Sequence, residues 1–318
     1  MISVLLPYRD AEETLAEALA SVLAERDIPL EILAIDDGSR DGSAASAAAF
    51  TDARVTHIRT NGVGIASACA VGMSVARGEI IARMDADDVS LPGRFAATLA
   101  LLDRVEAAGT CVDPFPVAAV GPGMRRYVDW LNGLLSPEDH ARAIFVESPL
   151  CNPSVAMRRD AYERVGGYRD VDGPEDYDLF LRMHAAGFCM AKSPHVGLRW
   201  RHHDRRMTVR DPRLALDKFV RMKAPYLASH LAGEPFAVWG AGRTGKRLSR
   251  ALESYGARPS CFVDVDPKKR IARGVPVVAP SACPRDRTIV VAVGDRGARA
   301  EVCAHLAALG VERVVCAA

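Results

Sequence analysis

The sequence has no excess of charge of either sign, since its 318 residues include 41 Lys and Arg and 40 Asp and Glu. This balance excludes a globally basic nucleic-acid coat protein and a chain with an acidic tail, although it permits a local charged patch. No apolar run reaches the ~18 residues of a membrane span. The first residues, Met1–Pro7, also lack the basic segment and cleavage site of a secretory signal. We therefore expect a cytoplasmic protein without a transmembrane segment.

Closely spaced cysteine pairs are also missing. The eight cysteines lie far apart, and no CxxC motif occurs. A secreted disulfide framework and a structural zinc site both require closer, paired cysteines. We therefore expect eight reduced cysteines that pack as small hydrophobic side chains.

The remaining composition is that of an ordinary globular protein, and the length predicts about two domains. Short apolar runs alternate with helical patterns in the first hundred residues, beginning with a strand at Ile2–Leu6 and a helix within Glu12–Ala24. This alternation predicts a mostly parallel α/β sheet that binds ligands at the carboxyl ends of its strands.

Prolines interrupt this pattern between Gly109 and Pro149, where we expect an irregular insertion followed by a helix that begins at Pro137. A short linker near residues 231–235 then separates two predicted domains. The first covers residues 1–232 and the second covers residues 233–318.

Four polar segments follow predicted strands or open predicted helices: Pro7–Asp10, Asp36–Ser43, Asp85–Asp88 and Gly173–Asp178. In the third segment, three carboxylates within four residues repel one another unless a cation lies among them. In the fourth, a carboxylate at the start of a helix is well placed to stay ionised as a base. Considered alone, each segment also suits a capped turn or a solvent-exposed acidic turn.

The order of these motifs resembles the family 2 glycosyltransferases with the GT-A fold, over about residues 1–205. The motifs are Pro7-Tyr8-x-Asp10, Asp36-Asp37-Gly38-Ser39, Asn61 with Gly62 and Gly64, Asp85-Ala86-Asp87-Asp88, and Glu175-Asp176. The resemblance implies a mixed, mostly parallel sheet and a metal-dependent, inverting transfer of a sugar. The donor would be a nucleotide-diphosphate sugar, with a UDP-sugar favoured, and the cofactor would be Mn²⁺ or Mg²⁺.

The resemblance also implies a role for each matching residue. The donor nucleotide would contact Pro7, Tyr8, Asp10, Asp37, Asp85 and Arg201. The metal would be held by Asp87, Asp85, His203 and His202. Asp176 would be the general base that deprotonates the acceptor hydroxyl, and Glu175 would help to hold the acceptor or the donor. Arg9 stands where the family often has asparagine, which leaves its role open.

The chain also resembles the queuosine-tRNA galactosyltransferases, which are also called β-1,3-N-acetylglucosaminyltransferase-like proteins. This resemblance rests on the two-domain layout and on the stretches Arg126–Asn132, Pro174–Asp176, Arg201–His203 and Phe236–Gly242. That resemblance would make a tRNA nucleoside the acceptor instead of a saccharide. The stretch Arg199–Lys223 carries nine Lys and Arg against three Asp. It suits binding of tRNA phosphates, and it equally suits a solvated helix with a lid over the diphosphate.

The predicted second domain begins with a strand at Phe236–Trp239, followed by a glycine motif and a helical pattern. With an acid about twenty residues later, this is the dinucleotide-binding fingerprint of a Rossmann-like domain. The candidates for a second nucleotide site are Gly240, Gly242, Gly245 and Asp264. Acceptor docking or formation of a homodimer are alternative roles for this domain.

Two other enzyme classes remain as alternatives. An NAD(P)-linked oxidoreductase would use the Gly240–Gly245 motif, but no hydride-transfer constellation accompanies that motif. A nucleotidyltransferase shares the fold and the metal carboxylates, but Pro7–Ala11 lacks the glycines of its phosphate-binding loop. The donor sugar and the acceptor do not follow from the sequence, because sugar selectivity depends on the shape of the pocket.

Overall fold

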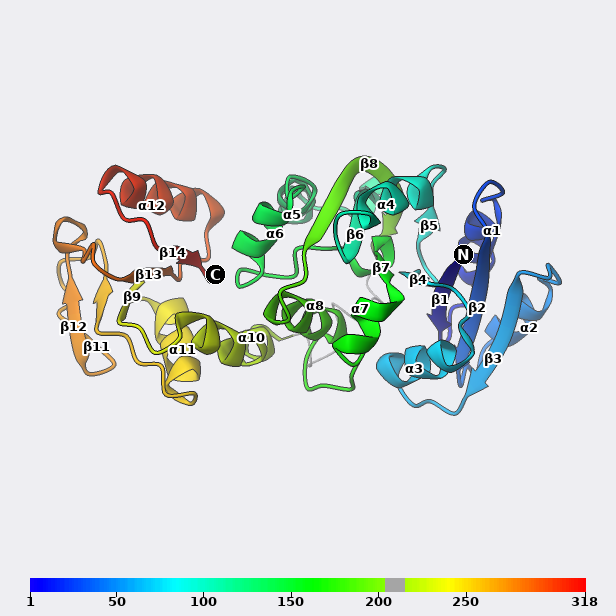
Figure 1. The fold of residues 1–318 in the computed structure, drawn as a ribbon, viewed down its shortest axis with the longest axis horizontal. Helices are drawn as coiled ribbons and strands as arrows, with labels where there is room; N and C mark the ends of the chain where they lie inside the picture. The colour runs from blue at the N-terminus through cyan, green and yellow to red at the C-terminus, as the bar shows by residue number, and fades with distance from the viewer. Residues whose placement is uncertain (204–214) are drawn as a thin grey trace. The chain divides into compact units, whose positions relative to one another are not determined.

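The computed structural model describes residues 1–203 and 215–318, which form two compact units (Figure 1). The first unit lies within Met1–Ala141 and Pro149–Arg210, and the second within Arg142–Ser148 and Asp211–Ala318. Helix α10 (Leu216–Leu231) belongs to the second unit because it packs against α11 (Arg243–Glu253), whereas the boundary predicted from the sequence follows α10. Part of the basic stretch Arg199–Lys223, residues 204–214, lies outside the described residues.

The first unit contains a mixed sheet with the strand order β3-β2-β1-β4-β7-β6-β8-β5. Its first four strands run parallel: β1 (Ile2–Tyr8), β2 (Leu30–Asp37), β3 (Val55–Thr60) and β4 (Ile80–Arg83). Helices join them as predicted: α1 (Leu15–Leu23), α2 (Ser43–Ala48) and α3 (Ile65–Val75). The apolar runs produce the two inner strands of this parallel group, β1 and β2, since every residue of both is buried.

The other half of this sheet mixes both strand directions. Strand β7 (Ala156–Arg158) lies antiparallel between β4 and β6 (Ala107–Phe115). Strand β8 (Met190–Arg201) runs parallel to β6, and the short β5 (Val89–Ser90) pairs antiparallel with β8. The helices of this half are α4 (Arg94–Leu102), α5 (Pro122–Asn132), α6 (Pro137–Ala143), α7 (Arg159–Arg164) and α8 (Glu175–Ala185).

The prediction of an irregular insertion from Gly109 onward is wrong over much of this segment, because β6 and α5 lie within it. Pro114 is tolerated in β6 because this half of the strand pairs only with β8. Pro122 is the first residue of α5, where a backbone N–H would have no acceptor within the helix. The helix predicted at Pro137 is confirmed as α6, and Ser136 Oγ accepts a bond from Asp139 N at its start.

The second unit contains a six-stranded sheet in the order β11-β12-β10-β9-β13-β14. Five strands are parallel: β9 (Phe236–Trp239), β10 (Cys261–Val263), β12 (Val275–Val278), β13 (Thr288–Val291) and β14 (Val314–Cys316). The short β11 (Ile271–Ala272) is antiparallel, and α12 (Arg296–Ala308) follows β13. Because β10 and β13 flank β9, the order is that of a Rossmann-like sheet, as predicted.

Each unit has its own hydrophobic core, built from buried strand and helix residues. The eight cysteines form no disulfide, as expected. Their expected burial holds for Cys69, Cys111, Cys151 and Cys283, whereas Cys189 is exposed and the other three are partly exposed. Within residues 1–203 and 215–318, each helix is too short or too polar to cross a bilayer.

Candidate active site

Three of the predicted polar segments meet at one edge of the first sheet. Strands β1, β2 and β4 are parallel neighbours, with Tyr8 beside Asp36 and Leu5 beside Arg83. Their carboxyl ends therefore bring the loops after Tyr8, Asp37 and Arg83 together. This is the edge at which open α/β sheets bind ligands.

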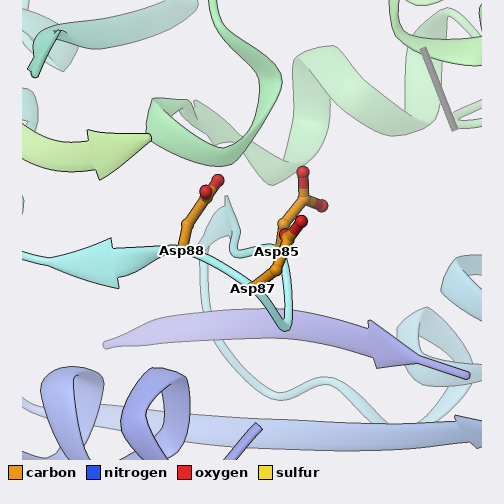
Figure 2. Close-up of side chains that lie close together, drawn as sticks. All are labelled: Asp85, Asp87 and Asp88. Carbon is orange, nitrogen blue, oxygen red and sulfur yellow. The ribbon is translucent and has the colours of Figure 1, made fainter. Parts of the chain in front are cut away.

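Asp85, Asp87 and Asp88 form an acidic cluster between β4 and β5, and we call these three residues the acid triad. Each offers a carboxylate oxygen, and these oxygens lie within 4.8 Å of one another. Figure 2 shows the three side chains extending to the same side of the loop. His203 Nε2 lies 3.0 Å from Asp87 Oδ2. Carboxylate oxygens with an imidazole nitrogen suit Mn²⁺ and, through the oxygens, Mg²⁺, so these residues fit the predicted cation.

The structure separates the two candidate histidines. His202 is buried, and its ring packs edge-on against Trp200 with 4.7 Å between the ring centroids. The backbone of His202 donates a hydrogen bond to Phe115 O at 2.7 Å. His203 therefore lies at hydrogen-bonding distance from Asp87 of the acid triad, while the ring of His202 packs against Trp200.

Arg201 supports the loop that carries the acid triad. Its backbone N–H donates to Asp88 Oδ1 at 2.7 Å, and its Nε donates to Asp87 O at 2.6 Å. The guanidinium also pairs with Glu17 and lies 4.4 Å from the centre of the Phe115 ring. Arg201, which is predicted to contact the donor nucleotide, thus has protein partners on several sides.

Asp37, which is also predicted to contact the donor nucleotide, organises the loop after β3. Its Oδ1 accepts bonds from Thr60 Oγ1 at 2.6 Å and Val63 N at 2.8 Å, and its Oδ2 accepts from Gly64 N at 2.9 Å. Burial alone would raise the pKa of this carboxyl, but the three hydrogen bonds lower it. Both oxygens of Asp37 are therefore engaged by the chain.

The remaining predicted donor residues lie at the end of β1. Pro7 and Tyr8 are buried, and burial together with the charge of Asp36 raises the pKa of Tyr8 to about 12. Asp10 has a φ of 51°, and its Oδ1 accepts a hydrogen bond from Arg40 N at 2.8 Å. This bond ties the loop after β1 to the loop after β2.

The predicted catalytic pair occupies the first turn of α8. Burial raises the pKa of Asp176 to about 7, and the charges of Glu175 and Asp85 add to this rise. The influence of Asp85 places the start of α8 within electrostatic range of the acid triad. A carboxyl that titrates near neutrality is suited to accept a proton. Two residues later, Asp178 pairs with Arg182 at 2.7 Å and anchors the helix.

Sequence analysis missed two buried arginines beneath the acid triad. Arg83 Nη2 lies 2.8 Å from Asp85 Oδ1, and Arg94 Nη2 donates to Arg83 O at 2.5 Å. The sequence feature that could have indicated Arg83 is its place as a charged residue at the end of the apolar strand Ile80–Ala82, shortly before the acid triad.

In the second unit, packing accounts for two glycines of the motif. Gly240 has a φ of 108°, and a Cβ there would lie 3.0 Å from Ala292 O. A Cβ on Gly245 would lie 1.9 Å from Gly240 O, so the helix approaches the strand too closely for any side chain. Gly242 faces open space.

The acid of the same motif is engaged within its own loop. Asp264 Oδ2 accepts bonds from Ala241 N at 2.7 Å and from Lys269 Nζ at 2.9 Å. In dinucleotide-binding domains this acid holds a ribose hydroxyl. Nucleotide binding by the second unit stays a prediction.

A sequence model of the family described as glycosyl transferase family 2 matches residues 3–166. The chain belongs to this family. The protein EpsE of Bacillus subtilis (strain 168) is 32% identical over 198 residues, which cover 59% of this chain and 68% of EpsE. The UDP-Gal:alpha-D-GlcNAc-diphosphoundecaprenol beta-1,3-galactosyltransferase of Escherichia coli is 26% identical over 186 residues, 56% of this chain and 65% of that enzyme.

Among solved structures, Staphylococcus aureus TarS 1–349 in complex with UDP-GlcNAc superimposes with a TM-score of 0.59. The match covers 79% of this chain and 71% of TarS at 15% identity, which shows a shared fold. The predicted enzyme class and GT-A fold of this family 2 glycosyltransferase are thus confirmed. The narrower resemblance to queuosine-tRNA galactosyltransferases stays a prediction.

Proposed function

We propose that this glycosyltransferase moves a sugar from a UDP-sugar to an acceptor hydroxyl, with inversion and with Mn²⁺ or Mg²⁺ bound at the acid triad. The proposal is supported by the contact of His203 with the acid triad at one sheet edge and by the effect of the Asp85 charge on Asp176 at the start of α8. The names of the E. coli galactosyltransferase and of the TarS complex support a UDP-sugar as donor.

Asp87 and His203 would hold the cation, because their side chains already lie 3.0 Å apart. Asp85 would lie nearer the ribose or sugar, and His202 would support His203 from its buried position. When bound, the ion would offset the negative charge that develops on the departing diphosphate.

The loops after β1 and β2 would form the nucleotide pocket. Pro7, Tyr8 and Asp10 would line it, and Asp37 would shape it through its bonds to the loop after β3. Arg201 would act at the diphosphate end, where it also supports Asp87 and Asp88.

Asp176 would remove the proton of the acceptor hydroxyl as its oxygen attacks the anomeric carbon. The bond to the nucleoside diphosphate breaks in the same step, so the configuration at the anomeric carbon inverts. A pKa of about 7 leaves a large fraction of Asp176 ionised at neutral pH and makes the protonated form accessible after transfer. Glu175, the preceding residue, would help to hold the acceptor or the donor.

For the acceptor, two classes remain. A saccharide fits the E. coli relative, whose name describes transfer to a GlcNAc-diphosphoundecaprenol. A queuosine-type tRNA nucleoside fits the two-domain layout. The second unit, with Gly240, Gly242, Gly245 and Asp264, would then serve acceptor docking, a homodimer or a second nucleotide. A cytoplasmic location suits either acceptor.

The proposal is tested by following nucleotide release from UDP-glucose, UDP-galactose, UDP-GlcNAc and GDP-mannose, in Mn²⁺ and in EDTA. At least one UDP-sugar should release UDP in Mn²⁺ only, and Asp176→Asn should stop transfer to an added acceptor without weakening UDP binding. Equal release in EDTA, or normal transfer by Asp176→Asn, would contradict the assignment. Turnover of NADH instead would favour the oxidoreductase alternative.

A further inference from the structure

Two arginines lie beneath the acid triad and are almost completely buried. Arg83 ends β4 with 2% of its surface exposed, and Arg94 begins α4 with 1% exposed. Burying a guanidinium is costly unless charges and hydrogen-bond acceptors surround it. Their burial against the chain segment that leads into the acid triad therefore needs an explanation beyond packing.

The contacts of Arg83 connect it to the acid triad. Its Nη2 lies 2.8 Å from Asp85 Oδ1, and its Nη1 donates to the backbone oxygen of Met84. Arginine is not deprotonated in proteins, so the side chain of Arg83 is a cation. Arg83 thus holds Oδ1 of Asp85.

Arg94 supports the same chain segment from below. Its Nη2 donates to Arg83 O at 2.5 Å, and its Nη1 lies 3.1 Å from Met84 Sδ. Burial lowers the pKa of Arg94 to about 10, while the charges of Asp88 and Asp85 oppose this, so it is protonated at neutral pH. The three carboxylates and two guanidiniums together carry a formal charge of −1 when all are ionised.

This charge balance has a consequence for the cation. A divalent ion next to Asp85 meets the guanidinium of Arg83, which repels it and already occupies Asp85 Oδ1. The ion is thereby directed toward Asp87 and His203, and its retention depends on the charge of an incoming diphosphate.

We propose that Arg83 is a positioning residue for sugar transfer, which holds Asp85 toward the donor and keeps it from ligating the cation. This inference rests on the function proposed above. Arg83 thereby weakens binding of the cation alone and strengthens binding of the nucleotide together with the cation. A role in folding alone would affect both affinities in the same direction.

The test compares wild type with Arg83→Gln, which keeps a polar side chain of similar reach without the charge. The Kd of Mn²⁺ alone is measured from the free-ion electron paramagnetic resonance signal, and the Kd of UDP by calorimetry at saturating Mn²⁺. We expect Mn²⁺ alone to bind about threefold more tightly and UDP to bind about tenfold more weakly. The matched control is Arg158→Gln at the other end of the β4–β7 pair, which should change neither value.

A double-mutant cycle identifies the residue through which Arg83 acts. In an Asp85→Asn background, Arg83→Gln should no longer weaken UDP binding, because the carboxylate that Arg83 positions is gone. Arg83→Lys, which keeps the charge, should restore the wild-type Mn²⁺ affinity and provides the comparison if Arg83→Gln does not fold.

Parallel weakening of both affinities, or additive effects of Arg83→Gln and Asp85→Asn on the affinity for UDP, would overturn the role of Arg83. A wild-type protein that binds UDP equally with and without Mn²⁺ would instead overturn the proposed function itself.

Discussion

Replacing Asp176 by Asn should stabilise the metal-free protein while abolishing transfer. The ordinary pKa of this carboxyl, 3.8, is raised to about 7 by burial and by the charges of Glu175 and Asp85. The folded state therefore holds the proton more tightly than the unfolded state does. As pH rises from about 4 to about 7, ionisation of Asp176 destabilises the fold, and above pH 7 the penalty is complete.

The size of this penalty follows from the pKa. A change from 3.8 to about 7 corresponds to about 4 kcal/mol for a fully enclosed group. Asp176 is partly exposed, so solvent screening reduces the expected value to about 1–2 kcal/mol. For a unit of this size, that gain corresponds to a rise in Tm of about 2–8 °C at pH 8.

The assay is thermal unfolding in EDTA at pH 4, 6 and 8, with UDP binding in Mn²⁺ measured separately. The matched control is Asp178→Asn, two residues along the same helix, where Asp178 pairs with Arg182 at 2.7 Å. That substitution breaks a buried ion pair and should lower stability by about 3 kcal/mol. The reasoning is refuted if Asp176→Asn lowers the Tm at pH 8, or if its effect is the same at pH 4 and pH 8.

Two further predictions concern stability away from the acid triad. Lys223→Met should destabilise the second unit by about 2–4 kcal/mol, because the buried Nζ donates to Phe145 O at 2.7 Å and Ala317 O at 2.8 Å. Scanning calorimetry should show a lower Tm, and the affinity for UDP should be unchanged. An unchanged Tm would contradict the prediction. Burial and the charge of Lys192 lower the pKa of His140 to about 4. The contribution of neutral His140 to the free energy of unfolding is therefore complete above pH 6.5 and is lost as pH falls toward 4. We compare the free energies of unfolding in urea of wild type and His140→Asn. The value for wild type minus that for the variant should be about 2 kcal/mol larger at pH 7 than at pH 5. A difference that does not change with pH would refute this.

The sequence predicted which segments meet at the site, because the rule for parallel strands needs only strand order. Tyr8, Asp37 and Asp85 each end or follow a buried strand, so their placement at one edge follows from alternating strands and helices. The resemblance to known glycosyltransferases named both His202 and His203 as candidates, and the contact of His203 with Asp87 is known only from the structure.

Contacts that depend on loop conformation were not predictable. The oxygens of Asp37 are used by Thr60, Val63 and Gly64, and this depends on a loop in which Gly64 has a φ of 89°. The prolines that predicted an irregular segment were overridden by tertiary pairing of β6 with β8. Arg83 was missed because a charged residue at the end of a strand is usually exposed, and its burial depends on the carboxylate of Asp85.

The most direct test of the central claim is the binding of UDP with and without a divalent cation. Calorimetric titration of wild type should give tight binding in Mn²⁺ and little or none in EDTA, because the diphosphate beside the acid triad needs a counter-charge. Asp87→Asn should lose the Mn²⁺-dependent binding, whereas Asp27→Asn, an exposed aspartate just before β2, should retain it. Equal UDP affinity in Mn²⁺ and EDTA, or wild-type affinity in Asp87→Asn, would contradict the account.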